Sequence, residues 1–383
     1  MTVATETFPE IPLFDLRLTP EDLEAVAETL RSGWLTMGPR TEQFELAFAE
    51  HLGCRHAVAV SSCTAALHLA YLAAGVGPGD QVIVPSFTFA ATASAAIYCG
   101  AEPVFCDIVG QRDLSIDPAE VERLITPRTK VVTAVHFAGF PAAVDVLSAL
   151  CEERGIVLVE DAAHAPSSTL HRRKLGTFGL AGAFSFFSNK VLSVGEGGLV
   201  ATDSDEVAAR ARSLRSHAMS SNTWDRHTQR TDTYDISELG FNYRLDDPRA
   251  ALLLSRLRTI EQDIARRREL VLEYRRRLAP LDGLVVPYED EQVAESSCYV
   301  MPIMLAEPGR QSAFRRSLRE RGVQTSLLYP AIHEFSEYRR RFPGVSLPRT
   351  ELAARTEVTI PLYPHITAGE QDRVISAVEE ALA

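Results

Sequence analysis

Residues 183–190 read AFSFFSNK, and residues 195–198 read GEGG. The only lysine of this stretch, Lys190, therefore stands between an apolar run typical of a strand and a glycine-rich loop. Upstream, residues 156–159 read IVLV, and Asp161 follows closely after them. An apolar run of this length is typical of a buried strand, so the pattern places an acid at the end of a second strand.

A lysine and an acid at two strand ends are the pair that pyridoxal 5'-phosphate (PLP) chemistry requires. The lysine forms a Schiff base with the cofactor, and the acid keeps the pyridine nitrogen protonated so that the ring can accept electrons. Burial would raise the pKa of Asp161 unless a cation paired with it, and a pyridinium N–H is such a cation. An acid that only caps the next helix is the alternative interpretation.

Lys190 differs from an ordinary, solvated surface lysine because residues 186–187 (FF) and 191–192 (VL) flank it. A free ammonium would be costly in such a context. A Schiff base avoids that cost, and the released amine can act as a general base with a depressed pKa.

Three further positions fit the same cofactor, each with a simpler alternative. One is the junction between a predicted strand and a helix, at Ser62, Cys63 and Thr64. Free backbone N–H groups and the helix dipole at such a junction can bind a phosphate. The alternative is that these residues only cap the N-terminus of the helix. Phe89 follows the next strand and can stack on the pyridine, or it can be a core residue. His164 can touch the phenolic oxygen of the cofactor or simply begin a helix.

Composition narrows the class of protein. The chain has 383 residues and a formal net charge of -12, which argues against nucleic-acid binding. The six cysteines are scattered without a CxxC pair, so we expect thiols and no metal site. No run of 18 apolar residues occurs, and residues 1–7 lack the features of a signal peptide, so we expect a cytoplasmic protein without a membrane anchor.

Short apolar strands alternate with helical stretches over the first half of the chain, which predicts an α/β fold with a mostly parallel sheet between helices. We expect strands at residues 57–60, 82–84, 104–106, 131–135 and 156–159, and helices at 20–31, 41–51, 65–74, 118–125 and 142–153. One long helix is expected at 246–278, with Pro248 as an early break, and a long functional or mobile loop at 219–235. We divide the chain into an N-terminal segment and helix (1–32), a large PLP-binding domain (33–255) and a smaller C-terminal α+β domain (256–383).

The chain resembles the DegT-type nucleotide-sugar aminotransferases, a family of fold-type I PLP enzymes, over nearly its whole length. The motifs that carry the resemblance lie at residues 32–39, 62–67, 77–89, 160–165, 185–198, 239–244, 328–333 and 361–364. Relatives often have glycine where Cys63 stands. Some relatives replace the lysine by histidine and become dehydratases, so the presence of Lys190 favours transamination.

The resemblance implies a role for each matching position. Lys190 and Asp161 would be the catalytic residues, as Schiff-base lysine and partner of the pyridine nitrogen. Phe89 and His164 would contact the cofactor ring, and Ser185 would join Ser62, Cys63 and Thr64 around its phosphate, with Asn242 reaching that phosphate from the neighbouring subunit of a homodimer. The sugar site would be lined by Trp34, Leu35, Thr36, Leu328, Tyr329 and His333.

The expected function is transfer of an amino group from glutamate or glutamine to a nucleotide-linked ketosugar in amino-sugar biosynthesis. Pyridoxamine phosphate would form in the first half-reaction and aminate the ketone in the second. A cyclitol (inosose) aminotransferase is the nearest alternative enzyme. A PLP-binding regulatory protein is a second alternative, which the intact lysine and acid disfavour.

Overall fold

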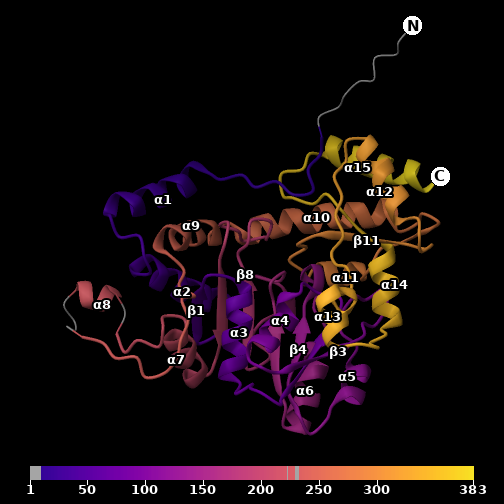
Figure 1. Cartoon of the computed structure of the whole chain (residues 1–383). Coiled ribbons are helices and arrows are strands. Elements are labelled where there is room, and N and C mark those ends of the chain that lie inside the picture. Colours follow the sequence, from indigo (N-terminus) through magenta and orange to yellow (C-terminus); the bar gives the residue numbers. More distant parts are fainter. Residues whose placement is uncertain (1–9, 222, 229–232) are drawn as a thin grey trace.

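The computed structural model describes residues 10–221, 223–228 and 233–383 (Figure 1). A seven-stranded sheet occupies the first half of the chain, and a separate three-stranded antiparallel sheet occupies the C-terminal part. The predicted α/β class with a smaller C-terminal α+β part is confirmed. The borders predicted at residues 32 and 255 stay predictions, and the first nine residues of the expected N-terminal segment lie outside the described ones.

The strands of the large sheet are, in order across it, β1 (His56–Val60), β9 (Gly198–Thr202), β8 (Ala181–Ser185), β5 (Val157–Asp161), β4 (Thr129–Val135), β2 (Gln81–Pro85) and β3 (Glu102–Cys106). The small sheet has β10 (Leu284–Val285), β11 (Met301–Leu305) and β12 (Glu357–Ile360), and a short hairpin has β6 (Thr169–Leu170) and β7 (Arg173–Lys174). Only β9 runs against its neighbours in the large sheet. The other strand ends therefore meet at one edge, where ligands bind in open α/β sheets.

The helices described are α1 (Pro20–Ser32), α2 (Pro39–Leu52), α3 (Cys63–Ala73), α4 (Ala91–Tyr98), α5 (Pro118–Leu124), α6 (Val144–Arg154), α7 (Asp205–Leu214), α8 (Thr223–His227), α9 (Asp247–Leu257), α10 (Ile260–Leu278), α11 (Asp290–Val293), α12 (Gln311–Glu320), α13 (Ser336–Arg341), α14 (Pro348–Thr356) and α15 (Ala368–Leu382). The predicted helices and strands of the first half all form, with ends shifted by a few residues. None of the described helices is both long and apolar enough to cross a membrane.

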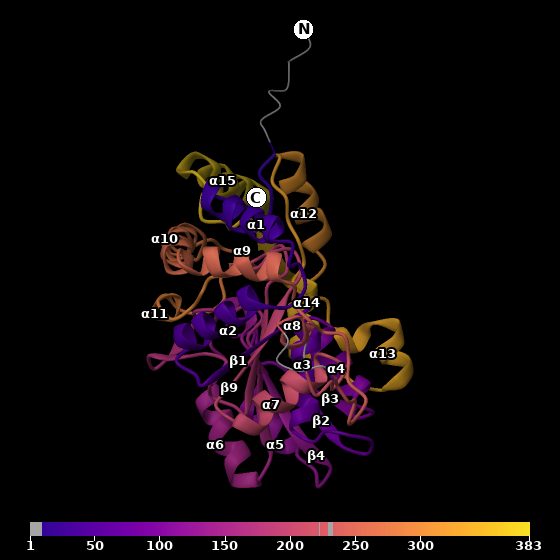
Figure 2. The same cartoon turned by 90° about the vertical axis from the view of Figure 1, so that its left-hand side faces the viewer.

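The large sheet is covered on both faces. Along β1, Val58 and Val60 pack into one apolar cluster with α3, α4 and α7, while Ala57 and Ala59 pack into another with α2 and α6. This alternation follows from the two-residue period of a strand. α10 runs between the large sheet and the C-terminal helices α12 and α15 in both views (Figures 1 and 2).

The expectation of one helix over 246–278 is wrong. α9 ends at Leu257 and α10 begins at Ile260. Backbone hydrogen bonds between residues three positions apart close the turn between the two helices. Pro248 does not cause the break, because it lies in the first turn of α9, where its missing N–H is not needed. The two helices have different partners: α9 packs on α1 and α2, and α10 packs on α11 and α15.

The predicted loop at 219–235 is partly described. Its base is closed by a bridge between Met219 and Ile236, and it carries the short helix α8. Residues 222 and 229–232 of this stretch lie outside the described part of the chain.

Candidate active site

A cavity of about 400 Å³ opens at the edge where the strands of the large sheet end. It collects side chains from loops far apart in sequence, including Tyr299, Leu328 and Tyr329 from the C-terminal part. Ten predicted site residues line it: Ser62, Cys63, Thr64, Phe89, Asp161, His164, Ser185, Lys190, Leu328 and Tyr329. β5 and β8 are neighbours with Asp161 beside Ala183, which brings the acid and the lysine loop together.

Of the three lysines of the chain, Lys190 is the one that lines the cavity. Lys130 is exposed on β4, and Lys174 forms a 2.9 Å ion pair with Glu261. The amine of Lys190 is enclosed by the cavity walls, and Nζ lies 4.3 Å from the centre of the Tyr299 ring. Burial lowers the pKa of Lys190 to about 8. A substantial share of this amine is therefore neutral near pH 8, as a general base requires.

Asp161 lies at the buried end of β5 with both carboxylate oxygens held. The Thr92 hydroxyl donates to Oδ2 over 2.8 Å, and the backbone N–H of Ala163 donates to Oδ1 over 3.2 Å. Burial raises the pKa of Asp161, while these two hydrogen bonds and Lys190 act in the opposite direction. A buried carboxylate of this kind is stabilised by a cationic N–H donor, which is what a protonated pyridine nitrogen provides.

His164 is neutral and has a defined tautomer. Its Nδ1 accepts the backbone N–H of Ala138 over 3.2 Å, so the proton is on Nε2, which donates to the Tyr329 hydroxyl over 3.0 Å. Burial lowers the pKa of His164 well below its usual range, and Lys190 adds to the effect. Since Tyr329 accepts this bond, its own O–H is free to donate to a ligand oxygen.

The N-terminus of α3 forms another wall of the cavity. Ser62 caps the helix by accepting the N–H of Ala65, so the capping interpretation is confirmed. Phosphate binding at the same turn stays a prediction, because a cap does not exclude it. Cys63 and Thr64 belong to the first turn, whose N–H groups have no partners within a helix. The backbone of Gly198 approaches Ser62 so closely that a Cβ there would lie 2.3 Å from the Ser62 carbonyl carbon. Glycine is thus required beside this helical turn.

Five predicted site residues do not line this cavity. Leu35 and Thr36 are exposed, and Asn242 is exposed beside its backbone bridge to Ser216. His333 is buried, with Nδ1 2.7 Å from the Ser86 hydroxyl and Nε2 3.5 Å from Glu351.

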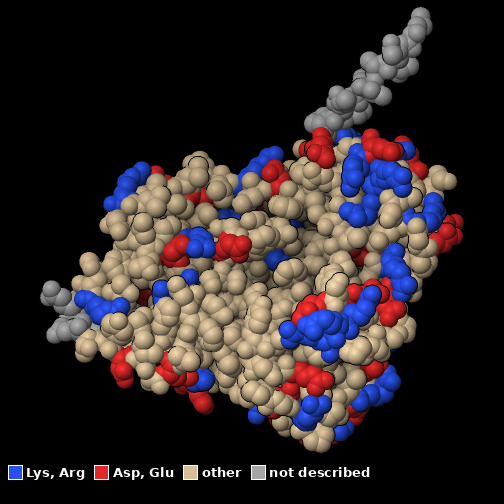
Figure 3. Space-filling model, in the orientation of Figure 1, with Lys and Arg blue, Asp and Glu red and all other residues tan. Residues whose placement is uncertain are grey.

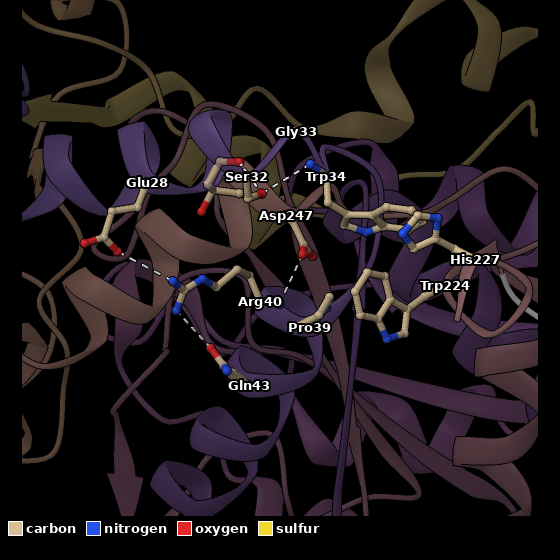
Figure 4. A pocket seen from close by; sticks show the side chains of 11 residues that line it. Glu28, Ser32, Gly33, Trp34, Pro39, Arg40, Gln43, Trp224, His227 and Asp247 are labelled. Carbon is tan, nitrogen blue, oxygen red and sulfur yellow. Dashed lines mark hydrogen bonds and ion pairs between the residues drawn. The ribbon is translucent and has the colours of Figure 1, made fainter. Parts of the chain in front are cut away.

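Trp34, the fifth, lines a second pocket of about 530 Å³ between α1, α2 and α8 (Figure 4). Its ring lies 4.7 Å from the rings of Trp224 and His227. Asp247 closes the pocket and accepts the N–H groups of Gly38 and Thr41.

Thr92 and Tyr299 were not among the residues predicted from the sequence. Thr92 bonds Asp161 from α4, four residues after Thr88, and this Thr-x-x-x-Thr spacing was an available signal. Tyr299 reaches the cavity from the segment before β11, and no local pattern indicates it.

The side chains present fit PLP. The cavity joins an acid, a lysine, the Phe89 ring and a helix N-terminus suited to a phosphate. The buried Oδ1 of Asn189, on the same wall, has no hydrogen-bond partner in the protein and is available to a ligand donor.

Comparisons with known proteins agree with this chemistry. The chain is 37% identical over 366 residues, 94% of each chain, to the spore coat polysaccharide biosynthesis protein SpsC of Bacillus subtilis (strain 168). It superposes with a TM-score of 0.90 and 36% identity on the aminotransferase TlmJ from Streptoalloteichus hindustanus, over 97% of this chain and 99% of that one. The PLP form of the putative sugar aminotransferase Spr1654 from Streptococcus pneumoniae matches with a TM-score of 0.89 and 25% identity, over 98% and 100% of the two chains.

The expected enzyme class and cofactor are thereby confirmed. The model of the DegT/DnrJ/EryC1/StrS aminotransferase family matches residues 17–379. With the lysine, the acid and the helix N-terminus gathered in one cavity, the chain belongs to this family of sugar aminotransferases.

Proposed function

We propose that the enzyme transfers an amino group from glutamate or glutamine to a nucleotide-linked ketosugar. The observation that carries this proposal is the enclosed Lys190 amine in the same cavity as the buried Asp161 carboxylate. Bound PLP supplies a carbonyl that takes up the amino group and a ring that withdraws electrons from the reacting carbon.

Lys190 is the residue that we expect to move protons. With a pKa lowered to about 8 by burial, its free amine can accept the proton released from the amino-bearing carbon of the donor. In the second half of the reaction, Nζ delivers a proton to the sugar carbon that receives the amino group. Asp161 keeps a proton at the ring nitrogen of the cofactor, and Thr92 and Ala163 hold its carboxylate in place.

His164 and Tyr329 supply oriented donors. Because the imidazole is neutral and donates to Tyr329, the phenol is left to donate into the cavity. Phe89 contributes an aromatic wall, with its ring centre 5.9 Å from that of Tyr329. Cys63, with its Sγ 4.0 Å from Asp161, adds a neutral wall, because burial raises the pKa of its thiol.

A homodimer with shared sites fits the surface of the chain. α3 and α4 contain no Asp, Glu, Lys or Arg, and Figure 3 shows a wide area without charged side chains over these helices. Leu239 is 91% exposed in the segment that also carries the exposed Asn242. Such apolar exposure is typical of an interaction surface. We infer that a second copy covers it and receives Asn242 at its phosphate site.

The sugar substrate is proposed from the family and from the named role of SpsC in polysaccharide biosynthesis. An inosose is the alternative acceptor. An enzyme that acts on an inosose would need no pocket for a nucleotide. The cytoplasmic location expected from the sequence also stays a prediction.

One experiment separates these acceptors. The enzyme is loaded with PLP, given glutamate or glutamine, freed of excess donor, and offered a panel of nucleotide-linked ketosugars and inososes, with product masses recorded. We expect an amino product from at least one nucleotide-linked ketosugar. Amination of inososes alone would replace the proposal by the alternative. If neither glutamate nor glutamine transferred an amino group to the PLP-loaded enzyme, the aminotransferase assignment would be contradicted.

A further inference from the structure

The ring of Tyr299 contacts two titratable side chains of the cavity, Lys190 and His164. The Lys190 amine lies over the ring, 4.3 Å from its centre, and the His164 imidazole stacks against it with centres 4.4 Å apart and planes inclined by 28°. Tyr299 is 3% exposed. A cation held over an aromatic face away from water is stabilised by the negative potential of that face.

The backbone of Tyr299 is anchored from two sides. Its N–H donates to the Ala138 carbonyl over 2.9 Å, and its carbonyl accepts from Arg267 over 3.2 Å. The same guanidinium also donates to the carbonyls of Cys298 and Leu362, and it is buried in α10. The ring position is therefore set by the packing of the C-terminal part against the large sheet.

Few other groups can hold the Lys190 ammonium. In the part of the chain that the structure describes, no hydrogen bond or ion pair joins Nζ to another side chain. Asp161 favours the charged amine only at longer range, and burial outweighs it. His164 is neutral, and the Tyr329 phenol and the Glu196 carboxylate line the same cavity.

We propose that Tyr299 is a positioning residue that receives the amine of Lys190 whenever this lysine is not bound to the cofactor. The ring stabilises the ammonium, and in doing so it sets the pH at which the free lysine becomes a base. This inference rests on the proposed function, because it takes Lys190 as the reacting lysine.

The test measures the titration of Lys190 directly. The full-length protein is saturated with pyridoxamine 5'-phosphate, which has no aldehyde and leaves the lysine free. Its amines are then labelled with trace acetic anhydride at a series of pH values. Peptide mass spectrometry gives the labelled fraction of Lys190, with the exposed Lys130 as internal reference.

Tyr299→Leu should lower the midpoint of Lys190 labelling by about one pH unit, since a desolvated cation–π contact is lost. Tyr299→Phe should keep the wild-type midpoint, because the ring face remains. Loss of packing alone would let water reach the amine and raise the midpoint, so the direction of the shift separates the two causes. Tyr363→Leu, which removes a buried tyrosine outside the cavity, should leave the midpoint unchanged.

An unchanged or raised midpoint in folded Tyr299→Leu would overturn the proposal, as would an equal downward shift in Tyr299→Phe. If the leucine variant does not fold, Tyr299→Met removes the ring but keeps a long, flexible side chain that can fill the gap, and it is expected to give the same downward shift. Failure of the proposed function is visible separately, because borohydride reduction of the PLP-loaded enzyme would then label a lysine other than Lys190.

Discussion

The hydroxyl of Thr92 donates a 2.8 Å hydrogen bond to Oδ2 of Asp161. Burial raises the pKa of this carboxyl, and the Thr92 bond opposes that rise. The bond thus keeps Asp161 charged and oriented, as a partner of a protonated ring nitrogen must be.

Thr92→Val should raise the pKa of Asp161 further, because it removes a donor that favours the charged form. Hydrogen bonds to charged groups contribute about 1.5–3 kcal/mol, so we expect turnover to fall by roughly tenfold or more. The measurement is kcat as a function of pH. Thr92→Ser, which keeps the hydroxyl, is the matched control and should retain most of the activity. Equal losses in both variants would mean that packing of the methyl group matters, and not the hydrogen bond.

Lys190 should carry the cofactor. After PLP is added, borohydride reduction and peptide mapping are expected to label Lys190 and to leave Lys130 and Lys174 unlabelled. The reason is that the Lys190 amine lies in the cavity and burial lowers its pKa, whereas Lys130 is exposed and Lys174 is paired with Glu261. Lys190→Ala should keep its thermal unfolding temperature near that of the wild type and lose turnover. Label on either other lysine would refute the assignment.

Asn242 should act in the partner's site. Lys190→Ala subunits are mixed with subunits that carry a disabling Asn242 substitution, and the two are allowed to exchange. In a shared arrangement each mixed dimer has one site with both defects and one site with neither, so activity should recover toward half.

Mass-tagged subunits control for exchange in that experiment. If exchange is verified and both single variants are folded and inactive, the absence of recovery would show that Asn242 acts within its own chain.

Glu357 should make stability depend on pH. Its carboxyl accepts the N–H of Leu328 over 2.9 Å and the Thr359 hydroxyl, and burial raises its pKa to about 8. Between pH 4.5, the ordinary pKa of a glutamate, and about pH 8, Glu357 is protonated in the folded protein and ionised in the unfolded chain. The stability from this group is therefore fully present below about pH 4.5 and is lost progressively up to about pH 8.

Glu357→Gln should remove this contribution while keeping an acceptor for Leu328. The unfolding temperature of the variant should fall less between pH 6 and pH 8 than that of the wild type. Glu153→Gln, at a surface carboxylate, is the control. Parallel pH profiles for wild type and Glu357→Gln would mean that Glu357 is already ionised in the folded protein.

Much of the site was predictable because its residues lie at strand ends. Apolar runs mark buried strands, parallel strands end at one edge, and the residue that follows each strand is therefore placed near the others. This is why Asp161, Lys190 and the Ser62 turn were predicted correctly to be neighbours. The break between α9 and α10 was not predictable in this way, because it depends on which helices each half packs against.

The sequence by itself determined the fold class, the strand ends and the identity of the lysine and the acid, since these follow from local periodicity and short motifs. Only the tertiary structure decided that the amine of Lys190 lies over the ring of Tyr299, that Thr92 bonds Asp161, and that Trp34 and Asn242 lie outside the cavity of their own chain. Those contacts join elements up to more than a hundred residues apart. The Tyr299 contact depends on how the C-terminal part packs on the large sheet, and the Thr92 contact depends on how α4 packs on that sheet. Local sequence patterns encode neither packing.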